Sequence, residues 1–387
     1  MRLFDDVPRT RRGPASHYEG TFDFLTTSAQ PYAVNVRDLL ESWFSHYPVS
    51  HQANLRCQFR DNFDAAFFEL LLFELLARLD HQVSVHPEIP GSQSHPDFFA
   101  ESLGGKSCFL EARVAFDKTA AEAAKDRALS VLYDEINRWP LPDYFLHLHR
   151  VDFPPGQPPS GRRFRSFVAE KASQVDYSRA RASLEASNFS MLSTFEYREN
   201  NAVIEFTLFP VQQDNRGREG KRAIGAYPIQ TRWGSSTSAI RKALQRKASK
   251  YGRLSEPFLI AVNSVSNWGT RRSNALEALF GSEHIVIEPL SERGRLGRNA
   301  DGFWNGPAGP RHRHISAVLI GSMNPFNLHV ADLTLWLNPW AAIPYEGPLI
   351  HLPSANIESS HVVFRDGISI GQLLGIPADW PGDRDED

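Results

Sequence analysis

Apolar and polar positions follow two different periods along the first half of the chain. The segment RDNFDAAFFELLLFELLARLD (60–80) is apolar on almost every side, which is typical of a buried helix. QVSVHPEI (82–89) alternates with a period of two, and PDFFAE (96–101) and SCFLEARV (107–114) follow as two further strands. The intervening SLGGK (102–106) predicts a hairpin turn, because glycine readily adopts the backbone angles of a tight turn.

The same pattern continues with a helix over residues 117–139 and a strand over 143–151. The order helix, three strands, helix, strand predicts an α/β core across residues 51–151. Before it, residues 1–50 are expected to form a polar arm at 1–20 and an amphipathic helix at 35–48.

The second half of the chain follows a stretch dense in Pro and Gly, DFPPGQPPSGRR (152–163), which predicts a linker. Residues 164–375 alternate between strand and helix patterns, so we expect a second α/β region there. Its helix at 238–251 begins with Ser and Thr and is followed by Gly, the usual capping residues. Residues 376–387 form an acidic tail.

Composition narrows the class of protein. The chain is 41% hydrophobic and 22% charged, as globular proteins are, and no apolar run reaches the roughly 18 residues of a membrane span. The N-terminus lacks the apolar stretch of a secretory signal, and Cys57 and Cys108 form no C-x-x-C pair. We therefore expect a cytoplasmic protein without a membrane partner.

Charge leaves nucleic-acid binding open, because the net charge of −3 is an average and phosphate binding needs only a local basic patch. Lys242, Arg246 and Lys250 recur every four residues along the helix at 238–251, on a different side from its apolar residues. With Arg271 and Arg272 they are candidates for contacts to phosphates. The alternative is the solvated face of an ordinary amphipathic helix.

Carboxylates interrupt the apolar elements at three points: Glu69 in the helix, Asp97 at the start of the second strand and Glu111 in the third. Residues two apart in a strand share a face, so Glu111 and Arg113 point the same way. A buried carboxylate is costly unless it is paired or bound to a metal, and hard divalent cations prefer oxygen ligands. A site for Mg²⁺ or Mn²⁺ is one reading, and salt bridges within the sheet are the other.

Residues 60–150 resemble the PD-(D/E)XK, or restriction-endonuclease-like, nuclease superfamily. The resemblance lies in the "PD" of the second strand, the "EAR" of the third strand and the order of the elements. The resemblance implies a restriction-endonuclease-like core in which Asp97 and Glu111 are metal ligands. It also implies that Glu69 is a third carboxylate, acting directly or through water.

Arg113 stands where the family has a lysine, which positions the attacking water and stabilises charge in the transition state. Arginine is able to offset phosphate charge, but it is effectively never deprotonated. Alternatively a lysine comes from elsewhere in the sequence: Lys106, Lys118 or Lys125.

The resemblance implies metal-dependent hydrolysis of phosphodiester bonds, most of all a DNA endonuclease of the defence or repair type, with RNA not excluded as a substrate. The alternative, which Arg113 keeps open, is a catalytically inactive nuclease-like fold that binds nucleic acid or assembles with proteins. A homodimer and a separate partner protein are both compatible with this sequence.

Overall fold

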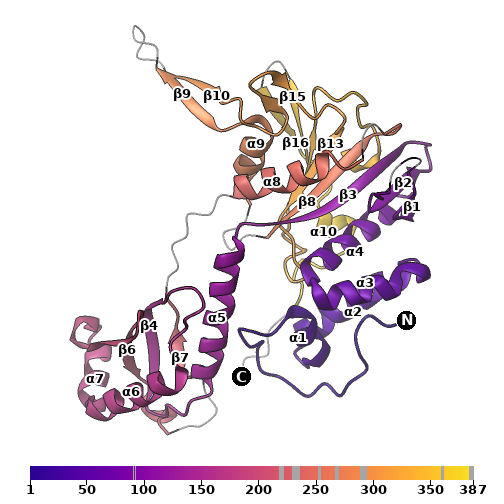
Figure 1. Cartoon of the computed structure of the whole chain (residues 1–387). Helices are drawn as coiled ribbons and strands as arrows, with labels where there is room; N and C mark the ends of the chain where they lie inside the picture. The colour runs from indigo at the N-terminus through magenta and orange to yellow at the C-terminus, as the bar shows by residue number, and fades with distance from the viewer. Residues whose placement is uncertain are drawn as a thin grey trace. The chain divides into compact units, whose positions relative to one another are not determined.

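The computed structural model describes residues 1–89, 91, 93–217, 222–228, 236–251, 254–265, 270–287, 294–358 and 361–382. The chain forms two compact units (Figure 1). Unit 1 comprises Met1–Pro14, Gly20–Asp117 and Gly234–Asp387, and unit 2 comprises Ala15–Glu19 and Lys118–Trp233. Along the sequence, most of unit 2 is therefore an insertion in unit 1.

Unit 1 is built on a mixed sheet, in which eight strands of the described residues follow the order β1-β2-β3-β8-β13-β14-β15-β16. The pairs β1–β2 and β2–β3 are antiparallel, whereas β8 is parallel to both β3 and β13. The strands are β1 (His81–Val85), β2 (Phe98–Ser102), β3 (Ser107–Phe116), β8 (Phe258–Val265), β13 (Ala317–Gly321), β14 (Leu333–Leu337), β15 (Ser354–Glu358) and β16 (His361–Arg365).

Helices cover both faces of this sheet. The first apolar cluster joins one face to α1 (Thr21–Thr27), α2 (Pro31–His46), α3 (Val49–Asp61), α4 (Phe63–Arg78) and α10 (Ile370–Leu373). The second joins the other face to α8 (Ser236–Ala248) and α9 (Arg272–Phe280). Helix α4 is apolar all round because it packs between the sheet and the neighbouring helices α2 and α3.

The remaining described elements of unit 1 are short. Two antiparallel strand pairs follow α9, and a 3₁₀ turn precedes β15. They are β9 (Glu283–Ile287), β10 (Gly294–Arg298), β11 (Asn305–Gly306), β12 (Gly309–Pro310) and η3 (Pro348–His351).

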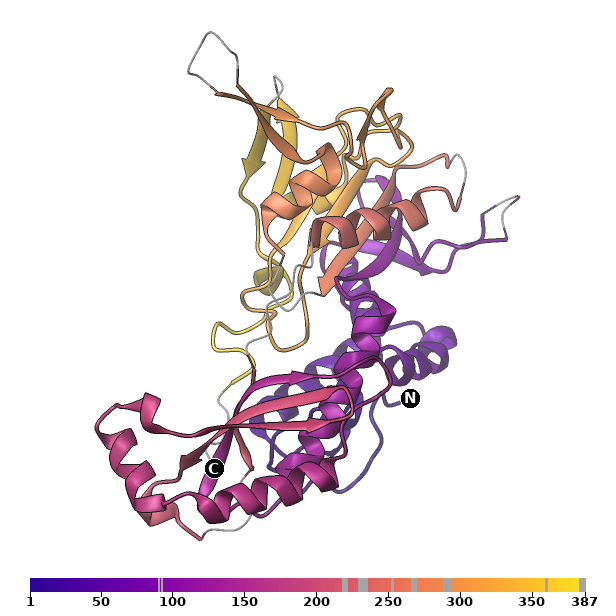
Figure 2. The same cartoon turned by 60° about the vertical axis from the view of Figure 1, so that its left-hand side comes forward.

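Unit 2 has its own sheet, with the order β5-β6-β4-β7 among the described residues. Its helices lie beside that sheet (Figure 2) and share one apolar cluster with it. The elements are α5 (Ala120–Asn137), β4 (Tyr144–Asp152), α6 (Gly161–Gln174), α7 (Tyr177–Glu185), η1 (Phe189–Met191), β5 (Thr194–Glu199), β6 (Ala202–Pro210), η2 (Gln213–Asn215) and β7 (Ile224–Ala226).

The mixed α/β class is confirmed, as are the helix and the three strands that begin the core expected at 51–151. The helix and the strand that were expected to complete this core do not belong to it. The helix expected at 117–139 is α5 and the strand at 143–151 is β4, and both belong to unit 2. In the sheet of unit 1, the next neighbour of β3 is β8, and α8 packs on that pair. Hydrophobic periodicity predicts the type of an element but not the sheet that it joins.

Two other expected boundaries also differ. Residues 152–163, expected as a linker, connect β4 to α6 within unit 2, where Phe153 is buried. Residues 1–20, expected as a polar arm, include the buried side chains of Leu3 and Phe4, whose backbone N–H groups donate to Glu41 of α2.

The second α/β region expected at 164–375 is divided between the two units at residue 233. Of the acidic tail at 376–387, residues 383–387 lie outside the described residues. In the described part of the chain, no helix has the length and apolar character needed to cross a membrane.

Candidate active site

The β2–β3 hairpin places Asp97 beside the middle of β3. Strand β2 begins at Phe98, which pairs with Leu110, while β3 continues to Phe116 alongside β8. Asp97 Oδ2 accepts the backbone N–H of Ala112 at 2.6 Å, just where β3 has lost its β2 neighbour. The carboxylate of Asp97 thus supplies an acceptor that the neighbouring strand no longer provides.

Glu111 lies next to this point and its side chain is 0% exposed. Its Oε1 forms an ion pair with Lys247 Nζ and lies 3.4 Å from Lys250 Nζ, and its Oε2 accepts the Tyr251 hydroxyl. The Tyr251 hydroxyl also lies 2.8 Å from the carbonyl oxygen of His95, so one proton serves two acceptors. Glu111 is therefore a buried carboxylate that is paired with cations, as the cost of an isolated buried charge requires.

The partners of Glu111 come from the C-terminal end of α8 and the turn after it. Lys247, Lys250 and Tyr251 stand at positions i, i+3 and i+4, which share one side of a helix. That side faces β3, since α8 packs on β3 and β8. Three residues of α8 and its following turn thus converge on one strand residue.

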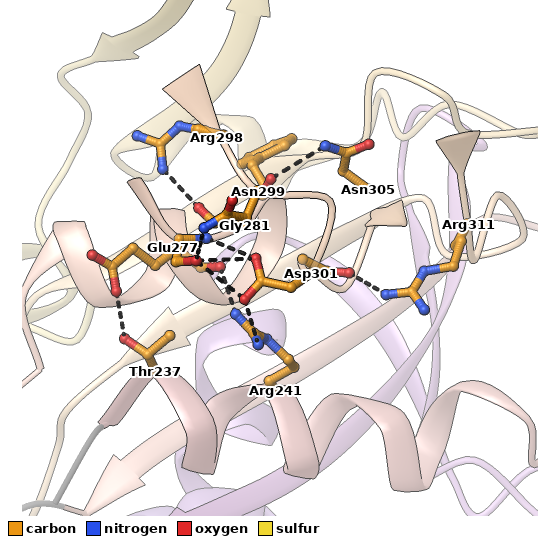
Figure 3. A network of polar contacts seen from close by, with 12 residues as sticks. Thr237, Arg241, Glu277, Gly281, Arg298, Asn299, Asp301, Asn305 and Arg311 are labelled. Atoms are coloured by element: carbon orange, nitrogen blue, oxygen red, sulfur yellow. Dashed lines mark hydrogen bonds and ion pairs between the residues drawn. The ribbon is translucent and has the colours of Figure 1, made fainter. Parts of the chain in front are cut away.

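A polar network fixes the other end of α8 (Figure 3). Arg241 Nη1 lies 3.3 Å from Asp301 Oδ2, and its Nη2 donates to the carbonyl oxygen of Glu277 at 3.1 Å. Thr237 donates to the Glu277 carboxylate at 3.2 Å. These bonds join α8 to α9 and to the chain after β10, and so hold the helix that carries Lys247.

Glu69 of α4 is the third carboxylate of the site. It is buried, accepts the Tyr47 hydroxyl at 2.6 Å and lies 3.8 Å from His86 Nε2. Burial raises the pKa of Glu69, the Tyr47 hydrogen bond opposes that rise, and the charge of Glu111 adds to it. Glu74, five residues further along and therefore about 140° round the helix, instead binds Arg78 at 2.9 Å.

Asp97 is a buried carboxyl whose pKa is raised by its surroundings. Burial raises the pKa of Asp97 to about 7, and the charges of Glu111 and Glu69 act in the same direction. The N–H of Ala112 and the ammonium of Lys247 oppose the rise. A carboxyl whose pKa is raised towards neutral pH by burial and, to a smaller extent, by neighbouring like charges is typical of functional sites.

Arg113 shares the face of Glu111 but makes no hydrogen bond or ion pair within the described residues. The lysines named as substitutes bind other carboxylates: Lys106 binds Glu346, Lys118 binds Asp126 and Lys125 binds Asp152. Two lysines of another element reach Glu111 instead: Lys250, expected only as a phosphate contact, and Lys247, which sequence reasoning missed. Its spacing from Lys250 and Tyr251 was the available signal, but nothing in the sequence pointed this side of the helix at β3.

The candidate phosphate-binding residues divide into three groups. Lys242 and Arg246 are exposed on α8, as expected of a surface stripe, whereas Lys250 reaches Glu111. Arg272 lies 3.3 Å from Asp332, and Arg271 is exposed at the start of α9. The five residues therefore do not form a single free patch.

Two carboxylates of the site, Asp97 and Glu111, provide oxygen ligands of the kind that a hard divalent cation prefers. Within the described chain, no group of three or more His, Cys, Asp or Glu side chains is placed to hold a metal. Mg²⁺ is commonly held by one or two carboxylates together with water and substrate phosphate. Asp97 Oδ1 accepts no hydrogen bond from the described residues, while both oxygens of Glu111 accept protein donors. A cation that binds Glu111 would therefore meet a carboxylate that already has protein donors, Lys247 among them.

Comparisons of this chain with protein-family models, with curated proteins and with solved structures found no match.

Proposed function

We propose that the chain is a metal-dependent nuclease whose restriction-endonuclease-like core is formed within unit 1. The order of elements in that unit supports this proposal: α4, the antiparallel strands β1 to β3, then α8 and the parallel strand β8. This is the order helix, three strands, helix, strand, with the chain of unit 2 inserted between β3 and α8.

The observation that carries the proposal is the convergence on Glu111. A fully buried carboxylate lies within electrostatic reach of Asp97 and Glu69, and its cation comes from a residue 136 positions away. Clustered like charges cost stability, so such an arrangement is expected where the charges perform chemistry.

The residues have distinct proposed roles. Asp97 and Glu111 hold Mg²⁺ or Mn²⁺, and Glu69 acts beside them, directly or through water. When bound, the cation neutralises phosphate charge and acidifies water. Lys247 and Arg113 supply positive charge on the face of β3 that presents Glu111, so the site has an ammonium as well as the guanidinium that replaces the expected lysine.

The substrate of the proposed nuclease is nucleic acid, with DNA proposed first. None of the residues named above distinguishes DNA from RNA. Lys242 and Arg246 are exposed on the helix that carries Lys247, so they are suited to contact backbone phosphates near the site. Such contacts position a strand without reading its sequence.

Cleavage of plasmid and single-stranded DNA with Mg²⁺, Mn²⁺ or EDTA tests the function. Wild type is expected to cleave with either cation and not with EDTA. Asp97→Asn and Glu111→Gln are expected to lose about 10²–10³-fold or more, the scale of removing one group that stabilises transition-state charge. Glu101→Gln, an exposed carboxylate of β2, is the matched control and is expected to cleave as wild type does.

A catalytically inactive binding module is the second candidate, because both oxygens of Glu111 already accept protein donors. Retention of DNA without cleavage under any cation would favour this candidate. Cleavage that survives in both Asp97→Asn and Glu111→Gln would place the chemistry elsewhere and contradict the proposed site.

A further inference from the structure

Lys247 is placed to do more than offset charge. Its ammonium contacts Oε1 of Glu111, and its own side chain is only 16% exposed. Lys250 Nζ is more distant, at 3.4 Å, and 35% exposed. Of the two lysines, Lys247 is therefore the resident counter-ion of Glu111, and Lys250 lies at the rim.

We propose that Lys247 and a divalent cation compete for the carboxylate of Glu111, so that binding of the cation releases the Lys247 ammonium. The inference rests on the proposed function, since it concerns the same site. Both oxygens of Glu111 already accept protein donors, so a divalent cation that reaches this carboxylate must displace one of them. The Lys247 ammonium is the nearest positive charge and is therefore the donor that the cation repels most. Because Glu111 is fully buried, its charge is costly without a close cation, and the divalent cation takes over this role when the Lys247 ammonium leaves.

The exchange gives the lysine a defined second role. In the metal-free protein it satisfies Glu111 and keeps unit 1 folded around a buried charge. In the loaded protein its ammonium is free to meet the phosphate of a bound nucleic acid. The role that the sequence resemblance gives to a lysine two residues after Glu111 would then fall to a lysine on α8.

Binding of Mn²⁺, measured by the electron paramagnetic resonance of the free ion at pH 8 without nucleic acid, tests the competition. Lys247→Met removes the ammonium and keeps similar length and volume. It is expected to bind Mn²⁺ about tenfold more tightly than wild type, a coupling of ordinary size. The melting temperature of the metal-free variant is expected to fall by several degrees, and Mn²⁺ is expected to restore more of it than wild type gains.

Two control variants distinguish direct contact with Glu111 from the general effect of removing a positive charge. Lys106→Met removes an exposed lysine from its ion pair with Glu346, and Mn²⁺ affinity is expected to be unchanged. Arg113→Met removes a cation from the same face of β3 that does not contact Glu111, and a smaller increase is expected. Should Lys247→Met fold poorly, the double variant Lys247→Met/Glu111→Gln is expected to recover stability and to lose Mn²⁺ binding.

The outcomes distinguish this inference from the proposed function. Equal Mn²⁺ affinity in wild type and Lys247→Met would overturn the competition and leave the metal-dependent function standing. The same holds if Arg113→Met and Lys247→Met raise the affinity equally. No Mn²⁺ binding by any variant would overturn both.

Discussion

Glu74 and Glu111 are buried carboxylates of unit 1 that bind cationic side chains, and they differ in where those cations come from. Glu74 is 2% exposed and binds Arg78, one turn along its own helix, and His46, both of which are about half exposed. Glu111 is 0% exposed and binds Lys247, from an element that follows 136 residues later.

Their surroundings differ as well. The pKa of Asp97 and that of Glu69 are both raised by the charge of Glu111, so Glu111 belongs to a group of like charges. A local pair such as Glu74–Arg78 stabilises the end of a helix and is partly screened by solvent. A group of carboxylates held together by a distant lysine lowers stability. Such a loss of stability, unlike a local ion pair, marks a candidate functional site.

The largest expected difference is in the free energy of unfolding when the cationic side chain of each pair is replaced by alanine. Lys247→Ala is expected to lower the free energy of unfolding by about 3 kcal/mol, because it leaves a fully buried charge with a weaker partner. Arg78→Ala is expected to cost less, about 1 kcal/mol, since Arg78 is about half exposed and Glu74 keeps its contact with His46. Urea denaturation of metal-free protein measures both. Equal losses would show that the two pairs are of one kind.

A second, pH-dependent difference follows from Asp97. Folding raises the pKa of Asp97 from 3.8 to about 7, so the folded protein keeps this proton between those values while the unfolded chain loses it. The stability contributed by protonated Asp97 is therefore present at pH 4, is lost as the pH rises towards 7 and stays lost above. Asn keeps an acceptor for the Ala112 N–H but carries no charge.

Asp97→Asn is accordingly expected to stabilise the metal-free protein by a few kcal/mol at pH 8, with an upper bound of about 4 kcal/mol for a pKa rise of roughly three units at about 1.4 kcal/mol per unit. The gain is expected to shrink as the pH falls and to be near zero at pH 4. Thermal unfolding between pH 4 and 8 measures it, with Glu101→Asn as an exposed control. A gain that does not change with pH would rule out charge as its cause.

The smallest expected difference compares Glu69 and Glu74 on one helix. Glu69→Gln keeps the acceptor for Tyr47 and removes a charge near Glu111, so its stability is expected to stay within about 1 kcal/mol of wild type, with DNA cleavage up to about tenfold slower. Glu74→Gln loses its ion pairs, so it is expected to lose about 1 kcal/mol without slower cleavage. Slower cleavage in Glu74→Gln alone would reverse the assignment of the two residues.

The hairpin that carries Asp97 and Glu111 could be predicted from the sequence, because its pairing depends on the local alternation of apolar and polar residues and on a Gly-Gly turn. The two strands pair as expected, and Asp97 meets the backbone of Ala112 as a consequence. The helix α8 was also predicted, from its apolar spacing and its capping residues.

The contact between that helix and Glu111 was not predictable in the same way. Lys247 and Glu111 meet only because β8 pairs with β3, and this pairing spans the whole of the inserted unit 2. Local periodicity carries no information on such a pairing, so α5, the next helix along the chain, took the place of α8 in the expectation. Buried Leu3 and Phe4 were missed for a similar reason, since two apolar residues in a polar segment have no period.

The insertion of unit 2 also has a consequence for biosynthesis. A ribosome that adds about 5–20 residues per second needs about 7–27 s for the 136 residues between Glu111 and Lys247. During that interval β3 has neither β8 as a neighbour nor a lysine for its buried glutamate. Unit 1 begins to emerge first, yet unit 2 is the first of the two whose chain is completely available for folding.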